Sequence, residues 1–320
     1  MSGNTYFPSR SIALKLLLAA LLIINNRGEI TAADSTYIKL TGLNKPVIIH
    51  TDAWGVAHIE AQTEADLFFG QGYQAAKDRL FQFEIFRRQA TGTLAEILGS
   101  RELDRDIGAR LFQFRGDMNK ELLHYHPRGD LIVRSFVRGI NAYIQWALGH
   151  RDQLPPEFDV LGIKPGYWTP EVVISRHNGL LANVQSELQT ARWILQIGEE
   201  RVTDLMNYHP HIPLLTLDTL FTKEGLKEDI LKWYNAFRKP VTFQPEDSRP
   251  SSFGYDADLE KLKSTSDEMS WFSPEFIDGS NNWVIDGSKT ESGYPMMAND
   301  PHRAISIPSL RYLIHLKAPG

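Results

Sequence analysis

The serine residues of this chain need a nearby base to do covalent chemistry, because a serine hydroxyl is a weak nucleophile at neutral pH. No Gly-x-Ser-x-Gly segment, the pattern of the nucleophile elbow, occurs in the sequence. A second source of a base is the α-amino group of a serine that is itself the first residue of a chain. The reference pKa of that amine, about 7.7 to 8.0, suits proton transfer near neutral pH. Such an amine exists only after the preceding peptide bond has been cut.

Ser280 is the serine that we expect to become the first residue of a chain after cleavage of the preceding peptide bond. The segments Asp278–Ile285 and Met297–His302 closely resemble the processing site and second-chain start of the penicillin acylase family of N-terminal nucleophile hydrolases. Six further segments resemble the family's first chain: Asp52–Ile59, Asp66–Tyr73, Asp78–Gln82, Arg87–Gly92, Leu154–Phe158 and Lys164–Pro170. The resemblance covers roughly residues 47–320, is weakest in the spacer, and favours the branch that includes acyl-homoserine lactone and cephalosporin acylases.

The resemblance implies an α+β fold, the four-layer αββα sandwich of N-terminal nucleophile hydrolases, with a helix-rich first-chain region. It also implies a precursor that cuts its own Gly279–Ser280 bond, releases a spacer and holds the two resulting chains together. Ser280 would attack the carbonyl of a small acyl amide, its free α-amine would relay the proton, and water would open the covalent acyl-enzyme. The alternative interpretation of Ser280 is an ordinary turn serine after a glycine.

His302 matches the position at which family members acting on cephalosporin side chains or acyl-homoserine lactones carry histidine. The resemblance implies that it orients the nucleophile and its amine, and an imidazole that is mostly neutral near pH 7 could polarise either group. The alternative is a solvent-facing loop histidine after Pro301. Asn282 and Asn299 are expected to brace the hairpin or position the nucleophile, and not to react.

The resemblance further implies a structural calcium ion at the junction of the two chains, and no cofactor for catalysis. Glu187 is the best match for the ligand from the first-chain region, since carboxylate oxygens suit this hard cation. The other expected ligands would fall after residue 320. The alternative interpretation of Glu187 is a solvated carboxylate on a helix face.

The family's oxyanion-hole donors are also expected after residue 320, and each missing donor costs a rate factor of about 10² to 10³. We therefore expect this chain to be the leading part of a longer precursor and a poor catalyst alone. The alternative from another class is a truncated, non-catalytic remnant that only binds ligands. β-Lactam side chains, fatty acyl-homoserine lactones and other amides are all compatible with the sequence, and His302 argues mildly against the phenylacetyl type.

Hydrophobic periodicity predicts a short strand pair followed by a mainly helical region. The expected elements are strands over 46–51 and 56–61 and helices from Thr63 to Gly92 and over about 106–125, 129–148 and 170–206. The first of these helices has the clearest ends, because Thr63 and Asp66 form a capping box and Gly92 stops the run.

The sequence divides into four expected regions. They are a signal peptide, 1–33, a first-chain region, 34–245, a linker or spacer, 246–279, and the start of the second chain, 280–320. The spacer is assigned because residues 241–276 are polar, rich in proline and serine, and without a sustained period. The last region is expected to form an antiparallel hairpin, 282–285 with 295–299, which leaves an unpaired edge after Asn299.

The first residues of the chain indicate export. Basic residues precede an apolar run, Leu16–Ile24, that is too short for the ~20 residues of a bilayer span, and small residues before Asp34 suit signal peptidase. We expect a periplasmic or secreted protein without a stable membrane anchor, a retained anchor being the alternative. The absence of cysteine excludes disulfides, and the net charge of -5 without basic runs argues against a nucleic-acid partner.

Three weaker signals receive a structural interpretation. The segment Gly70–Ala75 loosely fits a dinucleotide fingerprint but lies inside the expected helix, which favours a packing role. The histidine pairs at 124/126 and 209/211 lack further ligands at zinc spacing, so we expect surface histidines. Arg87 and Arg88 are expected on a solvated or ion-paired helix face.

Overall fold

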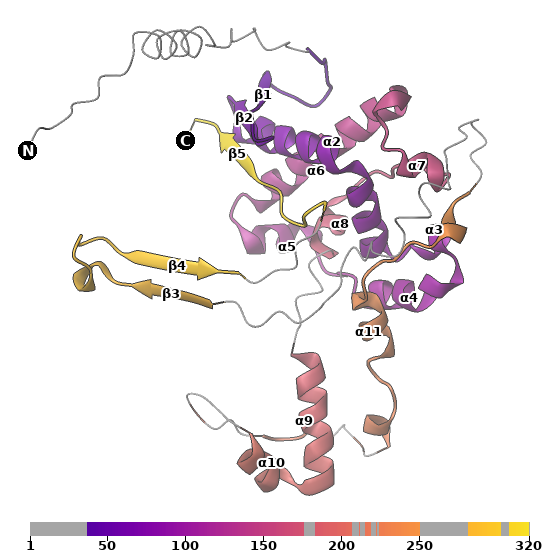
Figure 1. Ribbon diagram of the computed structural model, residues 1–320, viewed down its shortest axis with the longest axis vertical. Coiled ribbons are helices and arrows are strands. Elements are labelled where there is room, and N and C mark those ends of the chain that lie inside the picture. Colours follow the sequence, from indigo (N-terminus) through magenta and orange to yellow (C-terminus); the bar gives the residue numbers. More distant parts are fainter. Residues whose placement is uncertain are drawn as a thin grey trace, which may run out of the picture. The chain divides into compact units, whose positions relative to one another are not determined.

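The structure, a computed structural model, describes residues 37–175, 183–206, 211, 215–218, 222, 224–249, 281–301 and 307–319. The chain separates into a first unit, residues 1–41, and a second unit, residues 42–320. Every element described below belongs to the second unit, and Figure 1 labels most of these elements. Gly279, Ser280, His302, the expected signal peptide and most of the expected spacer lie outside the described residues.

Helix α2, Glu64–Thr91, begins and ends as the sequence predicts. The side-chain oxygen of Thr63 accepts a hydrogen bond from the backbone N–H of Asp66 at 3.1 Å, which caps the first turn. Gly92 ends the helix with a φ of 61°, a left-handed conformation that glycine adopts without steric cost. Within the helix, Arg79 departs from helical geometry, with φ -138° and ψ 30°, and produces a kink.

Helix α6, Gly129–Gly149, packs against α2 (Figure 1). Their backbones approach closely where each helix presents a glycine. A Cβ on Gly72 would overlap the carbonyl oxygen of Phe136, and a Cβ on Gly139 would overlap that of Phe69. The glycine of α2 therefore lies where packing requires it, in agreement with the structural interpretation of this segment.

A three-stranded sheet contains β1, Val47–Thr51, β2, Ala57–Ala61, and β5, Ile314–Lys317, in the order β1-β2-β5. Strands β1 and β2 are antiparallel, as a short strand pair around a turn predicts, whereas β5 pairs in parallel with β2. Buried Ile59 of β2 packs with half-buried Leu316 of β5 in one apolar cluster. The sheet thus joins residues 47–61 to residues 314–317, a pairing that the sequence did not predict.

The remaining described α-helices are α3, Ala95–Leu98, α4, Leu103–Leu111, α5, Met118–Tyr125, α7, Glu157–Val160, α8, Pro170–Ser175, α9, Val184–Ile197, α10, Glu199–Leu205, and α11, Lys232–Arg238. Short 3-10 turns span Ser100–Glu102, Arg151–Gln153, Gly225–Lys227, Pro245–Asp247 and Gly287–Lys289.

Two long helices expected from the sequence are each divided. The prediction of one helix over 106–125 is wrong, because α4 ends at residue 111 and Asp117 starts α5 by accepting hydrogen bonds from the backbone of Asn119 and Lys120. The prediction of one helix over 170–206 is also wrong, because Gly198, with φ 87°, separates α9 from α10. The helix over 129–148 is confirmed as α6.

The expected hairpin is confirmed as β3, Asn281–Ile285, paired with β4, Met296–Asp300. Its strands are almost entirely exposed, including the apolar side chains of Val284 (69%) and Met297 (73%). Within the described part of the chain, no helix is both long enough and apolar enough to cross a membrane.

Candidate active site

The open end of the β3–β4 hairpin is the described feature that adjoins the expected nucleophile. Asn281 and Asp300 are register partners at this end. In sequence, Ser280 directly precedes Asn281, and His302 follows Asp300 by two residues. Antiparallel pairing of the two strands therefore connects both expected catalytic residues to the same end of one hairpin, although neither belongs to the described residues.

Asn282 and Asn299 face each other across the hairpin as the next register pair inward from its open end. Both side chains belong to exposed residues of their strands. Directly opposed residues in an antiparallel pair are close enough for their side chains to interact. This placement fits the predicted bracing role, which stays a prediction.

The segment that follows His302 contacts α2 at its kink. The guanidinium of Arg79 donates to the carbonyl oxygen of Ser309 at 3.2 Å, and the hydroxyl of Tyr312 donates to the Asp78 carboxylate. Gln74 donates to both oxygens of the same carboxylate, at 3.1 and 3.0 Å. Burial, followed by the contact with Asp78, raises the pKa of Tyr312 well above its ordinary value. Sequence reasoning assigns no role to these side chains, although Asp78 and Arg79 lie in a segment that carries the family resemblance and Gln74 lies in the segment Gly70–Ala75.

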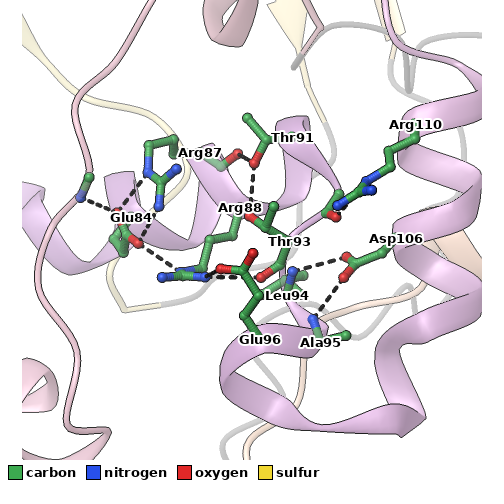
Figure 2. A network of polar contacts seen from close by, with 12 residues as sticks. Glu84, Arg87, Arg88, Thr91, Thr93, Leu94, Ala95, Glu96, Asp106 and Arg110 are labelled. Atoms are coloured by element: carbon green, nitrogen blue, oxygen red, sulfur yellow. Dashed lines mark hydrogen bonds and ion pairs between the residues drawn. The ribbon is translucent and has the colours of Figure 1, made fainter.

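A buried ionic network connects the second half of α2 to neighbouring segments (Figure 2). Glu84, 1% exposed, accepts hydrogen bonds from Arg87 at 2.9 and 2.7 Å and from Arg88 at 2.7 Å. It also accepts one from the backbone N–H of Gly166 at 2.8 Å, which ties α2 to the loop before α8. A second guanidinium nitrogen of Arg88, Nη1, donates a hydrogen bond to the Glu96 carboxylate at 2.9 Å. The ion-paired interpretation of the two arginines is confirmed.

Asp106 of α4 extends the same network (Figure 2). Its carboxylate accepts hydrogen bonds from the backbone N–H groups of Leu94 and Ala95, at 3.0 and 2.8 Å, and so caps the start of α3. Burial raises the pKa of Asp106, an effect that these two hydrogen bonds oppose. This network holds helices in place, and its exposed member is Glu96, whose side chain is 63% exposed.

Glu187 lies exposed on the first turn of α9, where its carboxylate accepts a hydrogen bond from the side chain of Asn183. Calcium takes six to eight oxygen ligands. The described residues contain no cluster of three acidic or histidine side chains that could hold a metal ion. Glu187 is thus a single carboxylate without described co-ligands, and its calcium role stays a prediction.

The sequence as a whole matches the model of the penicillin amidase family over residues 46–320. The chain belongs to this family. It is 30% identical to penicillin acylase 2 proenzyme of Pseudomonas sp. (strain SE83), over 87% of this chain and 33% of that protein.

It is also 28% identical to the acyl-homoserine lactone acylase QuiP of Pseudomonas aeruginosa, over 88% of this chain and 30% of that protein. With penicillin G acylase of Escherichia coli the identity is 26%, over 91% of this chain and 38% of that protein. The chain therefore spans about a third of the length of these relatives. A solved structure of penicillin G acylase from Alcaligenes faecalis shares 25% identity with it, covering 54% of this chain and 98% of that chain, with a TM-score of 0.44.

Proposed function

We propose that this chain is the amino-terminal part of an exported acylase precursor that hydrolyses acyl amides through Ser280 as an amino-terminal nucleophile. The observation that carries the proposal is the hairpin register, in which Asn281 opposes Asp300. Ser280 and His302 continue the chain from this end. Membership of the penicillin amidase family supports the amide as the bond that is cut.

In the proposed reaction the Ser280 hydroxyl adds to the acyl carbonyl while its own α-amine accepts the hydroxyl proton. The amine then passes this proton to the departing nitrogen as the carbon–nitrogen bond breaks, leaving an ester of Ser280. Water attacks the ester, with the same amine as base, and frees the acid. A neutral His302 holds the amine or hydroxyl in line, and Asn282 with Asn299 fixes the start of the strand.

The names of the relatives indicate which classes of acyl amide we propose as substrates. One relative is a penicillin acylase and another an acyl-homoserine lactone acylase. We propose a small acyl amide from these classes, with the acyl-homoserine lactone or cephalosporin type preferred because of His302. The proposed export and the calcium ligand Glu187 are separate parts of the hypothesis, and the catalytic steps need neither.

Intact-mass spectrometry of the purified 320-residue chain tests self-processing. We expect a fragment whose first residue is Ser280, and an uncut chain in the Ser280→Ala variant. The matched control is Ser292→Ala in the turn of the same hairpin, which retains the expected nucleophile and should be cut like the wild type. An uncut wild-type chain that hydrolyses a chromogenic acyl amide normally would falsify the proposal.

Hydrolysis of the chromogenic amide separates the enzyme from the ligand-binding alternative. Turnover that is lost in Ser280→Ala and kept in Ser292→Ala supports catalysis by Ser280. A chain that binds the amide with unchanged affinity in both variants, and turns over none of it, supports the remnant.

A further inference from the structure

Three histidines lie side by side on one face of the three-stranded sheet. His50 of β1 is the register partner of His58 of β2, which is in turn the register partner of His315 of β5. The ring centroids are 5.1 Å apart for His50 and His58 and 5.2 Å apart for His58 and His315. His50 and His315 are exposed, so this row of imidazoles is open to solvent.

Asp52 fixes the orientation of the central imidazole. One carboxylate oxygen accepts hydrogen bonds from the backbone N–H groups of Trp54 and Val56, at 2.8 and 3.0 Å. The other oxygen lies 3.0 Å from Nε2 of His58. A carboxylate at this position is ionised at neutral pH, which is far above the reference pKa of aspartate, about 3.9. An ionised carboxylate requires the proton on Nε2, and Nδ1 of neutral His58 then presents a lone pair.

A second nitrogen donor stands at metal-bridging distance from this lone pair. Nδ1 of His315 lies 3.2 Å from Nδ1 of His58. Two nitrogens that share a tetrahedral Zn²⁺ with bonds of 2.0–2.1 Å are separated by about 3.3–3.4 Å. A histidine that binds a metal through one nitrogen commonly donates its other N–H to a carboxylate, as His58 does to Asp52.

We propose that Nδ1 of His58 and Nδ1 of His315 bind a divalent transition-metal ion of the Zn²⁺ class, which bridges β2 and β5. Imidazole donors favour Zn²⁺, Cu²⁺ and Ni²⁺ over the oxygen-binding Ca²⁺ and Mg²⁺. No third acidic or histidine ligand converges on this point among the described residues, so water takes the remaining positions. This site is distinct from the calcium role predicted for Glu187 and does not depend on the proposed hydrolysis.

The metal replaces a proton between the two rings. Without metal, Nδ1–H of His315 donates to Nδ1 of His58. On binding, that proton leaves Nδ1 of His315 and neutral His315 carries its proton on Nε2, so that both Nδ1 lone pairs face the ion. The bridged residues are 257 positions apart in sequence, and the ion stabilises the parallel pairing of β2 with β5.

Calorimetric titration of ZnCl₂ into the full chain, purified without a histidine tag, measures the site. One saturable site is expected in the wild type. His58→Gln and His315→Gln should each weaken it at least tenfold, and Asp52→Asn by about 10- to 100-fold. His124→Gln, at the exposed end of α5, is the matched control and should bind as the wild type does. Zn²⁺ should raise the melting temperature of the wild type and control only.

A measurement on the unaltered chain guards against variants that fail to fold. Peptide mapping after treatment with diethyl pyrocarbonate should show that Zn²⁺ protects His58 and His315 from modification and leaves His124 reactive. The proposal is overturned if the wild type shows no saturable Zn²⁺ binding, if all variants bind equally, or if Zn²⁺ protects His124 as much as the bridging pair.

Discussion

Glu84 is buried and forms ion pairs with Arg87 and Arg88. Replacing it with glutamine keeps the shape of the side chain but leaves the guanidinium of Arg88, whose side chain is 10% exposed, without its nearest counter-charge. Removal of one partner from a buried ion pair costs about 3–5 kcal/mol. We expect Glu84→Gln to lower the free energy of unfolding by this amount, measured by urea denaturation.

The control for Glu84 is Glu121→Gln, which removes the charge of a half-buried carboxylate whose hydrogen bond with the hydroxyl of Tyr125 is exposed. Substitutions at exposed contacts of this kind change stability by about 0.5 kcal/mol or less. If the two variants had equal midpoints of urea denaturation, burial of Glu84 would not make its ion pairs more stabilising than the exposed contact of Glu121.

Asp52 predicts a stability difference that depends on pH. Its pKa is lowered in the folded chain, first by the hydrogen bond from His58 and then by that from Val56, so the stability it contributes is present above the unfolded pKa of about 3.8 to 3.9. This stability is lost as the pH falls through the folded pKa. The unfolding free energies of wild type and Asp52→Asn should therefore differ above pH ~4 and converge at lower pH. A gap that stays constant down to pH 3 contradicts the assignment.

At the scale of elements, the contact of α2 with α6 depends on glycines that no other residue can replace. Gly72→Ala puts a methyl group against the backbone of Phe136, which cannot move aside without shifting α6. Overpacking of this kind costs about 1–3 kcal/mol, which exceeds the stabilisation expected from the higher helix propensity of alanine. Thermal or urea unfolding should show a net loss of stability in this variant.

Gly149→Ala is the matched control, because a Cβ at this last residue of α6 has no atom within 4 Å. Only the propensity gain of up to about 1 kcal/mol is expected there. A Gly72→Ala chain as stable as Gly149→Ala would show that the two helices are less closely packed than described.

The sequence predicted those elements whose signals are local. Thr63 and Gly92 define both ends of α2, and the alternation around the glycines after Ile285 defines the hairpin. The break of the expected helix over 106–125 is not evident from the sequence, because the apolar period continues on both sides of the Asp117 cap that divides it. The parallel partner of β2 could not be predicted, because a strand of four residues carries no signal for a strand so distant in sequence.

In the candidate site too, features with a local sequence signal were predictable and contacts between distant segments were not. The hairpin on which Asn282 and Asn299 oppose each other was predictable from its alternation, and its register agrees. The contact of Tyr312 with Asp78 was not, because it is made by a helix kink and a loop that only the folded chain brings together. Sequence thus identified the strands that adjoin Ser280 and His302, and missed the helix that holds the segment beyond them.

At the scale of the whole second unit, residues 42–320, strand β5 pairs with β2 although the two strands lie far apart in the sequence. The proposed cut before Ser280 would place these two strands on separate chains. Their pairing is reinforced by Arg79 with Ser309 and by the apolar contact of Leu316 with the cluster around Ile59. We therefore expect the two pieces to stay associated without the covalent link between them.

A specific protease site inserted between residues 260 and 270 of the Ser280→Ala chain tests this independently of self-cleavage. After digestion the two pieces should elute together in size-exclusion chromatography and separate only in denaturant. Leu316→Asp should release the smaller piece, since a charge would enter the apolar cluster that joins β5 to β2. Lys317→Ala, which loses only an exposed ion pair with Glu60 at 3.2 Å, should leave the pieces together because such pairs contribute about 0–1 kcal/mol. Release in both variants, or in neither, would show that β5 does not hold the pieces through its apolar side.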